Sequence, residues 1–229
     1  MEQPSIDSPL EFVHVAPTTR TDGERPAVIV LHGRGANEDD LLPIADVLPD
    51  DLEIFSVRAP EPLGPGFTWY GLDLSRGGLH ASQPDPEDYE RSLNYLDEFI
   101  QQASEAHTLD PDRIGLLGFS QGAILALGAL VTHDRDYNWI AALHGYLPER
   151  FSVADLAAAP ATPIFIAGGE HDEVIPPTRA EDAAERLTAA GHDVTFRVYS
   201  LGHGIASSEV DDLVDWVANH HNVPADQTP

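Results

Sequence analysis

A serine, a carboxylate and a histidine in this sequence occur in settings that suit nucleophilic catalysis. Ser120 lies at the centre of Gly118-Phe119-Ser120-Gln121-Gly122, which directly follows one apolar run and directly precedes another. A Gly-x-Ser-x-Gly pattern between a strand and a helix predicts a sharp turn that exposes the serine hydroxyl. Glycines on both sides let the strand and the helix approach each other closely. We interpret Ser120 as a nucleophile; the alternative is a glycine-rich turn that happens to contain a serine.

A serine hydroxyl reacts well only when an imidazole accepts its proton and an acid orients that imidazole. When the serine lies on this kind of turn, the acid and then the histidine follow it along the chain. Asp172 comes after the apolar run 163–167 and a glycine pair, and His203 lies between two glycines after the run 194–199. We predict Asp172 as the acid, with Glu170 as its rival, and His203 as the base.

The choice of base among 11 histidines rests on their positions. Those that precede or adjoin the predicted acid have the wrong order along the chain; they are His14, His32, His80, His107, His133, His144 and His171. We interpret the remaining candidates, His192, His220 and His221, as solvated or capping histidines. His203 is therefore the predicted base.

An oxyanion hole is expected from two backbone N–H groups. When the serine lies on a turn between a strand and a helix, one N–H belongs to the residue after the nucleophile. The other belongs to the loop after an early strand. These are Gln121 and, within His32-Gly33-Arg34-Gly35, Arg34. The backbone amides matter more here than the side chains. The Arg34 guanidinium is left open as a ligand for a substrate anion or a solvated surface group.

Apolar runs and helical patterns alternate along the chain and define the elements that position these residues. Besides the run that leads into Ser120, we predict buried strands at 27–31, 52–57, 139–143 and 163–167, an edge strand at 11–16 and a last strand at 194–199. Helices are expected from a cap at Asp39 or Asp40 to Leu48, and at 87–106, 121–131, 179–190 and 210–218.

This alternation predicts an α/β fold with a mostly parallel central sheet and helices on both faces. The chemistry of such sheets lies at the carboxyl ends of the strands. We therefore expect His32-Gly33, Ser120 and the turns after Ala167 and Tyr199 at one edge of the sheet.

Residues 59–86 are rich in proline, glycine and aromatic residues and predict a long loop with little regular structure. Such loops in compact domains are usually functional or mobile. Candidates for an acyl pocket lie within or near it: Leu63, Phe67, Trp69, Leu72 and, just past the acid, Ile175. The alternative for each is that it covers the core.

Several motifs taken together resemble the phospholipase/carboxylesterase family of α/β-hydrolases, which includes acyl-protein thioesterases and small bacterial carboxylesterases. The motifs are Leu31-His32-Gly33-Arg34-Gly35-Ala36-Asn37-Glu38-Asp39-Asp40-Leu41, Arg58-Ala59-Pro60, Trp69-Tyr70, Gly118-Phe119-Ser120-Gln121-Gly122, Gly168-x-x-His171-Asp172-x-x-Ile175-Pro176 and Gly202-His203-Gly204. The resemblance runs from about residue 11 to 218. It implies an α/β-hydrolase fold, a Ser120–Asp172–His203 triad, and hydrolysis of short or medium acyl esters or thioesters, lysophospholipids included, without metal or cofactor.

The sequence departs from the family pattern at three places. Ala123 stands where eukaryotic relatives more often have glycine, and Gly204 follows the base in place of Glu or Ser. The run 139–143 ends in His144-Gly145, where Ser-Gly is more familiar. The early motif with Arg34 resembles prokaryotic carboxylesterases more than the depalmitoylating enzymes.

Composition narrows the other possibilities. The 229 residues predict a single domain over 1–229, with a core at about 11–218 and flexible termini. The absence of cysteine excludes disulfides, thiolate metal sites and the cysteine nucleophile of dienelactone hydrolases. No His-Glu-x-x-His motif suggests a metal hydrolase, and a peptidase would carry an added domain. The main alternative is a non-catalytic ligand-binding protein on the same fold.

No basic leader and no long apolar run is seen, so we expect a cytoplasmic protein, a monomer or homodimer, without membrane insertion.

Charge is the other strong signal. The chain has 39 acidic and 12 basic residues, a formal net charge of −27, and every basic residue is arginine. A field of this sign repels nucleic acid and anionic lipid. The family resemblance implies a small-molecule ester as the partner. We interpret the composition as an adaptation to a halophilic cytoplasm; the alternative is an ordinary acidic mesophilic protein.

We predict that salt stabilises the fold, because it screens the repulsion among these carboxylates. The free energy of unfolding should rise from low to molar KCl in denaturation curves. A parallel series in sucrose separates charge screening from general stabilisation by excluded solutes. A stability that stays flat across the KCl series would contradict the halophilic interpretation.

Overall fold

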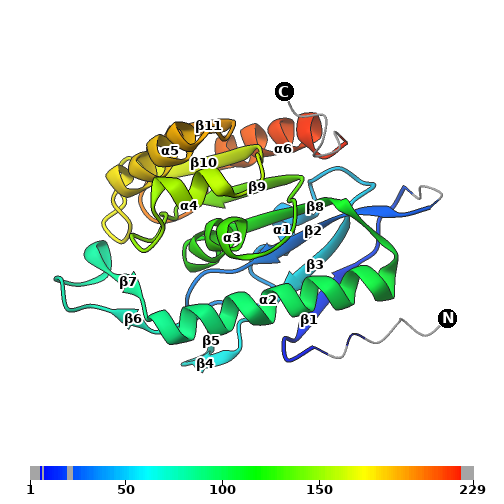
Figure 1. Cartoon of the computed structure of the whole chain (residues 1–229), viewed down its shortest axis with the longest axis horizontal. Coiled ribbons are helices and arrows are strands. Elements are labelled where there is room, and N and C mark those ends of the chain that lie inside the picture. The colour runs from blue at the N-terminus through cyan, green and yellow to red at the C-terminus, as the bar shows by residue number, and fades with distance from the viewer. Residues whose placement is uncertain (1–5, 7, 20–22, 223–229) are drawn as a thin grey trace.

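A seven-stranded sheet runs through the computed structural model, which describes residues 6, 8–19 and 23–222 (Figure 1). The strand order is β1-β3-β2-β8-β9-β10-β11. β1 pairs antiparallel with β3, and the other neighbouring pairs are parallel. The bounds are β1 Phe12–Val15, β2 Arg25–Leu31, β3 Glu53–Val57, β8 Leu109–Phe119, β9 Trp139–Leu143, β10 Ile164–Gly169 and β11 Val194–Tyr199. The predicted sheet and its edge strand are confirmed.

Helices cover both faces of the sheet (Figure 1). On β2, Ala27, Ile29 and Leu31 pack against one helical layer, and Val28 and Val30 against the other. The first layer contains α2 (Pro86–His107), α3 (Gln121–Thr132), α4 (Val153–Ala158) and α5 (Pro177–Ala190). The second contains α1 (Leu42–Ala45) and α6 (Ser207–His220). Burial on both sides explains why the inner strands β2, β9 and β10 are largely apolar rather than alternating.

Capping residues set the ends of several helices. The Asp85 carboxylate accepts hydrogen bonds from the N–H groups of Glu87 and Asp88 at the start of α2. Gly191 ends α5 with a φ of 101°, in the left-handed region that glycine adopts without strain. The helix α4 was not among the predicted elements, although its capping box, Ser152 with Asp155, is a sequence signal.

The helix expected up to Leu48 is wrong in extent. α1 covers only Leu42–Ala45 and has no side-chain cap at its start. Asp39 lies instead in a turn where its N–H donates to the Asn37 side chain at 3.0 Å. Pro43 has no N–H to donate to the Asp39 carbonyl, so a helix capped by Asp39 would lack its first bond.

Residues 59–86 contain more regular structure than predicted. β4 (Glu61–Leu63) and β5 (Gly66–Thr68) form one hairpin. β6 (Leu72–Asp73) pairs with β7 (Gln83–Pro84), and a 3-10 turn at Leu79–Ala81 lies between these two strands in sequence. β5 also meets the loop after β2, because Gly35 N–H donates to the Phe67 carbonyl at 2.7 Å. A Cβ at Gly66 would overlap the Gly35 carbonyl, so this contact requires glycine.

Among the described helices, none is both long and apolar enough to cross a membrane.

His133, which follows α3, is held in its neutral form. Its Nε2–H donates to the Leu93 carbonyl at 2.9 Å, so its Nδ1 is left to accept from the Tyr137 hydroxyl at 2.5 Å. Burial lowers the pKa of His133 to about 4, although nearby Asp97 acts in the opposite direction.

This histidine predicts a loss of stability in mild acid. The unfolded chain takes up the proton near pH 6.5, whereas the folded chain takes it up only near pH 4, so the unfolded state binds more protons in between. The free energy of unfolding therefore falls as pH drops from about 6.5 to about 4. Urea denaturation across that window should show a shallower fall for His133→Gln than for the wild type. Parallel curves would contradict the prediction.

Candidate active site

Ser120 lies on a strained turn between β8 and α3. Its φ is 53° and its ψ −114°, a conformation that residues other than glycine rarely adopt. The Ser120 N–H donates to the Leu143 carbonyl of β9 at 2.8 Å, which holds the turn against the sheet. A Cβ at Gly122 would overlap the Leu31 carbonyl, and one at Gly118 would overlap the Gly122 backbone. Both flanking glycines are therefore required by close backbone approach.

The structure brings Ser120, His203 and Asp172 together from three separate loops. His203 Nε2 lies 2.8 Å from Ser120 Oγ, and His203 Nδ1 lies 2.6 Å from Asp172 Oδ2. A carboxylate only accepts, so Nδ1 carries the ring hydrogen and Nε2 is left to accept from the serine hydroxyl. This is the tautomer that a general base requires. Glu170, the rival acid, is exposed and lies near His171 instead.

Asp172 is buried and remains the acceptor of several hydrogen bonds. Its Oδ1 accepts from the N–H groups of Val174 and Ile175, each at 2.8 Å. Burial, the largest single effect, raises the pKa of Asp172. The hydrogen bonds from His203 and the two N–H groups, together with the charge of His203, outweigh it, so the pKa lies below its usual value. The carboxylate stays ionised, as orientation of the imidazole requires.

The side chain of Gln121 anchors the predicted oxyanion hole, a role that sequence reasoning missed. Its Oε1 accepts from the Trp69 N–H at 2.9 Å and the Thr68 hydroxyl at 3.0 Å. Its Nε2 donates to the Tyr70 carbonyl at 2.8 Å. Gln121 is the first residue of α3, where N–H groups have no partner within the helix. Its backbone N–H is thus available beside Ser120.

Arg34 lies in a loop shaped by a buried histidine. His32 Nδ1 lies 2.7 Å from the Gly33 carbonyl, and its Nε2 accepts from the Ala59 N–H at 3.0 Å. Burial lowers the pKa of His32, more than the Gly33 bond raises it, which suits this neutral tautomer. The exposed Arg34 borders the same cavity as Ser120 and His203.

A cavity of about 160 Å³ opens beside the hydroxyl of Ser120. Its walls are mostly apolar and aromatic and come from Arg34, Tyr70, Leu72, Leu79, Ser82, Ser120, Gln121, Ile124, Tyr146, Val174, Ile175 and His203. Of the predicted pocket residues, Leu72 and Ile175 line it.

The structure corrects the pocket assignment of Leu63, Phe67 and Trp69, which do not line this cavity. Trp69 is fully buried, and its Nε1–H donates to the His32 carbonyl at 2.9 Å. The Phe67 ring lies under the Arg58 guanidinium at 4.7 Å. Leu63 is half-buried in β4. Of the aromatic residues in this segment, Trp69 therefore supports the loop after β2, whereas Tyr70 lines the cavity.

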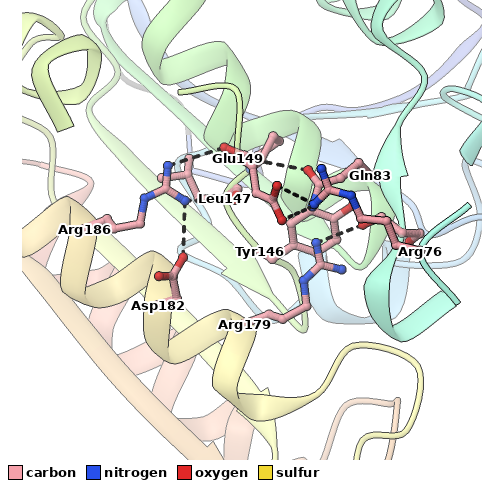
Figure 2. Close-up of polar contacts among 10 residues, drawn as sticks. Arg76, Gln83, Tyr146, Leu147, Glu149, Arg179, Asp182 and Arg186 are labelled. Atoms are coloured by element: carbon pink, nitrogen blue, oxygen red, sulfur yellow. Dashed lines mark hydrogen bonds and ion pairs between the residues drawn. The ribbon is translucent and has the colours of Figure 1, made fainter. Parts of the chain in front are cut away.

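A polar network holds one wall of the cavity in place (Figure 2). The Tyr146 hydroxyl and the Arg179 guanidinium both donate to the Ser82 carbonyl, each at 2.9 Å. Arg179 also lies over the Tyr146 ring, 3.2 Å from its centroid. Glu149 joins Arg76 at 2.6 Å and Gln83 at 3.4 Å, so residues before α2 are bound to the segment after β9 (Figure 2).

Two groups of three residues present metal-ligand atoms within 4.8 Å of one another among the described residues: His14, Glu53 and His107, and His144, Asp172 and His203. In the first, Glu53 already forms an ion pair with Arg25. In the second, Asp172 and His203 are engaged with Ser120 as described. That the site works without a metal stays a prediction.

His144 is a site neighbour that sequence reasoning placed outside the chemistry. It is buried, and its Nδ1 lies 3.4 Å from Asp172 Oδ2. The signal for it was present, because His144 stands at one of the departures from the family pattern and directly follows the apolar run 139–143.

Comparisons with known proteins place the chain among related sequences and structures. Residues 15–221 match the model of the phospholipase/carboxylesterase family. The chain is 28% identical to MhqD of Bacillus subtilis over 82% of this chain and 90% of that protein. It is 27% identical to acyl-protein thioesterase 1 of Candida albicans over 85% of this chain and 92% of that one. The solved structure of esterase PE8 superposes with a TM-score of 0.80, at 26% identity, over 92% of this chain and 99% of that one.

The Gln121 anchor yields a prediction about stability. Gln121→Ala leaves the buried Trp69 N–H without its acceptor, and each such loss costs about 1–3 kcal/mol. We expect chemical denaturation to show a decrease of that size. Thr68→Val, which removes only one hydroxyl from the anchor, should cost less. Equal stability of Gln121→Ala and the wild type would show that the anchor is unimportant.

Proposed function

Because the chain belongs to the phospholipase/carboxylesterase family, we propose that it is a serine hydrolase that cleaves short- to medium-chain carboxylic esters. Thioesters and lysophospholipids fall within the same chemistry. The observation that carries the proposal is the hydrogen-bonded path from Ser120 through His203 to Asp172, beside a cavity that can hold an acyl group. The named thioesterase and esterase relatives support the substrate class.

The proposed mechanism has two acyl-transfer steps. Ser120 Oγ attacks the carbonyl carbon while His203 Nε2 takes the hydroxyl proton, and the Asp172 carboxylate stabilises the imidazolium that forms. The N–H groups of Gln121 and Arg34 receive the oxyanion. The tetrahedral intermediate expels the alcohol or thiol, which takes the proton from His203. Water then attacks the acyl-enzyme while His203 takes its proton. The second tetrahedral intermediate releases the carboxylic acid, and Ser120 Oγ leaves with the proton returned by His203.

The cavity favours a small acyl group. Its volume of about 160 Å³ lies below the roughly 300–1,000 Å³ that holds a drug-sized ligand. Leu72, Val174 and Ile175 give the cavity apolar walls, which suit an apolar acyl chain better than a charged substituent. The proposed reaction needs neither a metal nor a cofactor, because the nucleophile, base and oxyanion donors all come from the chain.

The proposal describes a cytoplasmic enzyme, a monomer or homodimer, that acts on small molecules and not on nucleic acid. The net charge of −27 supports the exclusion of nucleic acid, since phosphate backbones are attracted by basic surfaces.

We predict that Ser120→Ala and His203→Ala each lower ester turnover by at least ~10³-fold, because each removes one member of a unit that acts together. Hydrolysis of p-nitrophenyl acetate in molar KCl measures this. Ser104→Ala, which changes a serine of α2 away from the cavity, should keep wild-type turnover. Near-normal turnover by either site variant would refute the assignment.

A fluorophosphonate probe provides an independent reading of the same site. The wild type and Ser104→Ala should become labelled at Ser120, and Ser120→Ala should not. A wild type that neither hydrolyses esters nor becomes labelled would instead support a non-catalytic ligand-binding protein on this fold.

A further inference from the structure

A buried histidine and a buried glutamate stand behind the acid of the proposed triad. His144 Nδ1 lies 3.4 Å from Asp172 Oδ2, and His144 Nε2 lies 3.2 Å from Glu209 Oε2. Both side chains are 0% exposed. The three groups come from the end of β9, the loop after β10 and the first turn of α6. The contacts therefore extend the Ser120–His203–Asp172 path across two further elements.

The backbone at His144 is held in a conformation that its side chain disfavours. Three residues other than glycine have a positive φ in the described structure: Thr108, Ser120 and His144, the last at 52°. Thr108 ends α2, where this conformation is common. The other two lie in the site, and strain of this kind, about 1–3 kcal/mol, persists where the surroundings enforce it. With this backbone conformation the His144 ring lies between the two carboxylates.

Glu209 does more than cap a helix. Its Oε2 accepts weakly from the Ala206 N–H at 3.4 Å, as a residue in the first turn of a helix often does. Such a role needs neither complete burial nor a histidine. Glu209 Oε1 has no partner among the described residues, so the ion depends on His144 for its main compensation. Burial of a carboxylate with so few partners is costly.

Proton counting shows why the pair acts as a unit. Each nitrogen of His144 faces a carboxylate oxygen, and an ionised carboxylate only accepts. Both contacts are satisfied when His144 and Glu209 together hold two protons, as an imidazolium with a carboxylate or as an imidazole with a carboxylic acid. In either form the pair has no net charge, and His144 Nδ1–H donates to Asp172 while His203 donates to the same oxygen.

We propose that His144 and Glu209 are positioning residues, which fix the Asp172 carboxylate and through it the His203 imidazole for proton transfer. This inference rests on the proposed function. Asp172 Oδ1 is already held by Val174 and Ile175, so among the described residues His144 is the group besides His203 that contacts Oδ2. The His144 and His203 rings also meet edge to face, with centroids 6.0 Å apart.

The charges around the base define a pH test. The titratable and charged groups that face His203 are Asp172, His144 and, across the cavity, Arg34; Glu209 faces His144 from α6. The test uses His144→Asn, because asparagine tolerates positive φ and its amide can still donate to Asp172. It also uses His144→Gly, which removes the side chain and relieves the backbone, and the isosteric Glu209→Gln.

We expect His144→Gly and Glu209→Gln to lower kcat by roughly tenfold or more with little change in KM, since misplacement of a catalytic group acts on the chemical step. His144→Asn should recover part of the loss. The acidic limb of kcat/KM should move to higher pH, by roughly half a unit, in His144→Gly, because Asp172 then loses a hydrogen-bond donor and stabilises the His203 imidazolium more strongly. It should return towards the wild-type position in His144→Asn, whose amide donates to the same oxygen.

His192→Gln is the matched control. His192 is also buried, but it binds the Leu156 carbonyl at 3.1 Å near the amino end of β10, away from the site. This variant should lose stability without a change in kcat or in the acidic limb.

Two results would overturn the inference: wild-type kcat and acidic limb in both His144→Gly and Glu209→Gln, or a failure of all three single variants to fold while His192→Gln folds. The second would make the pair a folding element only. If the proposed function itself is wrong, the wild type will show neither ester hydrolysis nor labelling of Ser120 by the fluorophosphonate. This result separates failure of the proposed function from failure of the inference about His144 and Glu209.

Discussion

The hydrogen bond between His203 Nδ1 and Asp172 Oδ2, 2.6 Å long, is the contact on which the site depends. It determines which nitrogen of His203 faces Ser120 and in which direction the ring points. The loops that supply the two residues follow adjacent parallel strands, β10 and β11, and Ser120 follows β8 two positions away in the sheet. Parallel strands end at one edge, so the sheet brings side chains 83 positions apart in sequence within 2.8 Å.

Buried carboxylates need partners that compensate for the loss of water, and in this acidic chain the partners are arginine and histidine. Four carboxylates in the described chain are buried: Glu38, Glu53, Asp172 and Glu209. Arg58 pairs with the first and Arg25 with the second, while histidines contact Glu53, Asp172 and Glu209. The chain has no lysine, so the buried carboxylates contact guanidinium and imidazole groups. These planar groups donate hydrogen bonds in fixed directions, which holds each carboxylate in a defined orientation. The same chemistry that tolerates buried anions also orients the acid of the site.

Sequence reasoning predicts the parts of the site that follow from strand order. Ser120, Asp172 and His203 each lie within a few residues of the end of a predicted strand and close to glycines, and the structure places them within hydrogen-bond distance. The extent of α1 and the hairpins of 59–86 were beyond that reasoning, because they depend on contacts such as the one between Gly35 and Phe67. Aromatic type could not separate Trp69, which anchors Gln121, from a cavity-lining residue. His144 was set aside because a base must follow the acid in sequence, a rule that says nothing about groups behind the acid.

Proposed catalysis and proposed selectivity draw on different parts of this fold. The triad and the oxyanion donors lie on loops that end or begin sheet elements, and their positions follow from strand pairing and from glycines that permit close approach. The cavity walls come largely from residues 70–82, Tyr146 and the segment before α5, where side-chain bonds such as Arg179 to Ser82 set the shape. Substitutions in the wall can therefore change the acyl group that fits without moving Ser120 or His203. Conversely, neither residue of the His144–Glu209 pair lines the cavity, so the proposed action of the pair on the base leaves the walls around the acyl group unchanged.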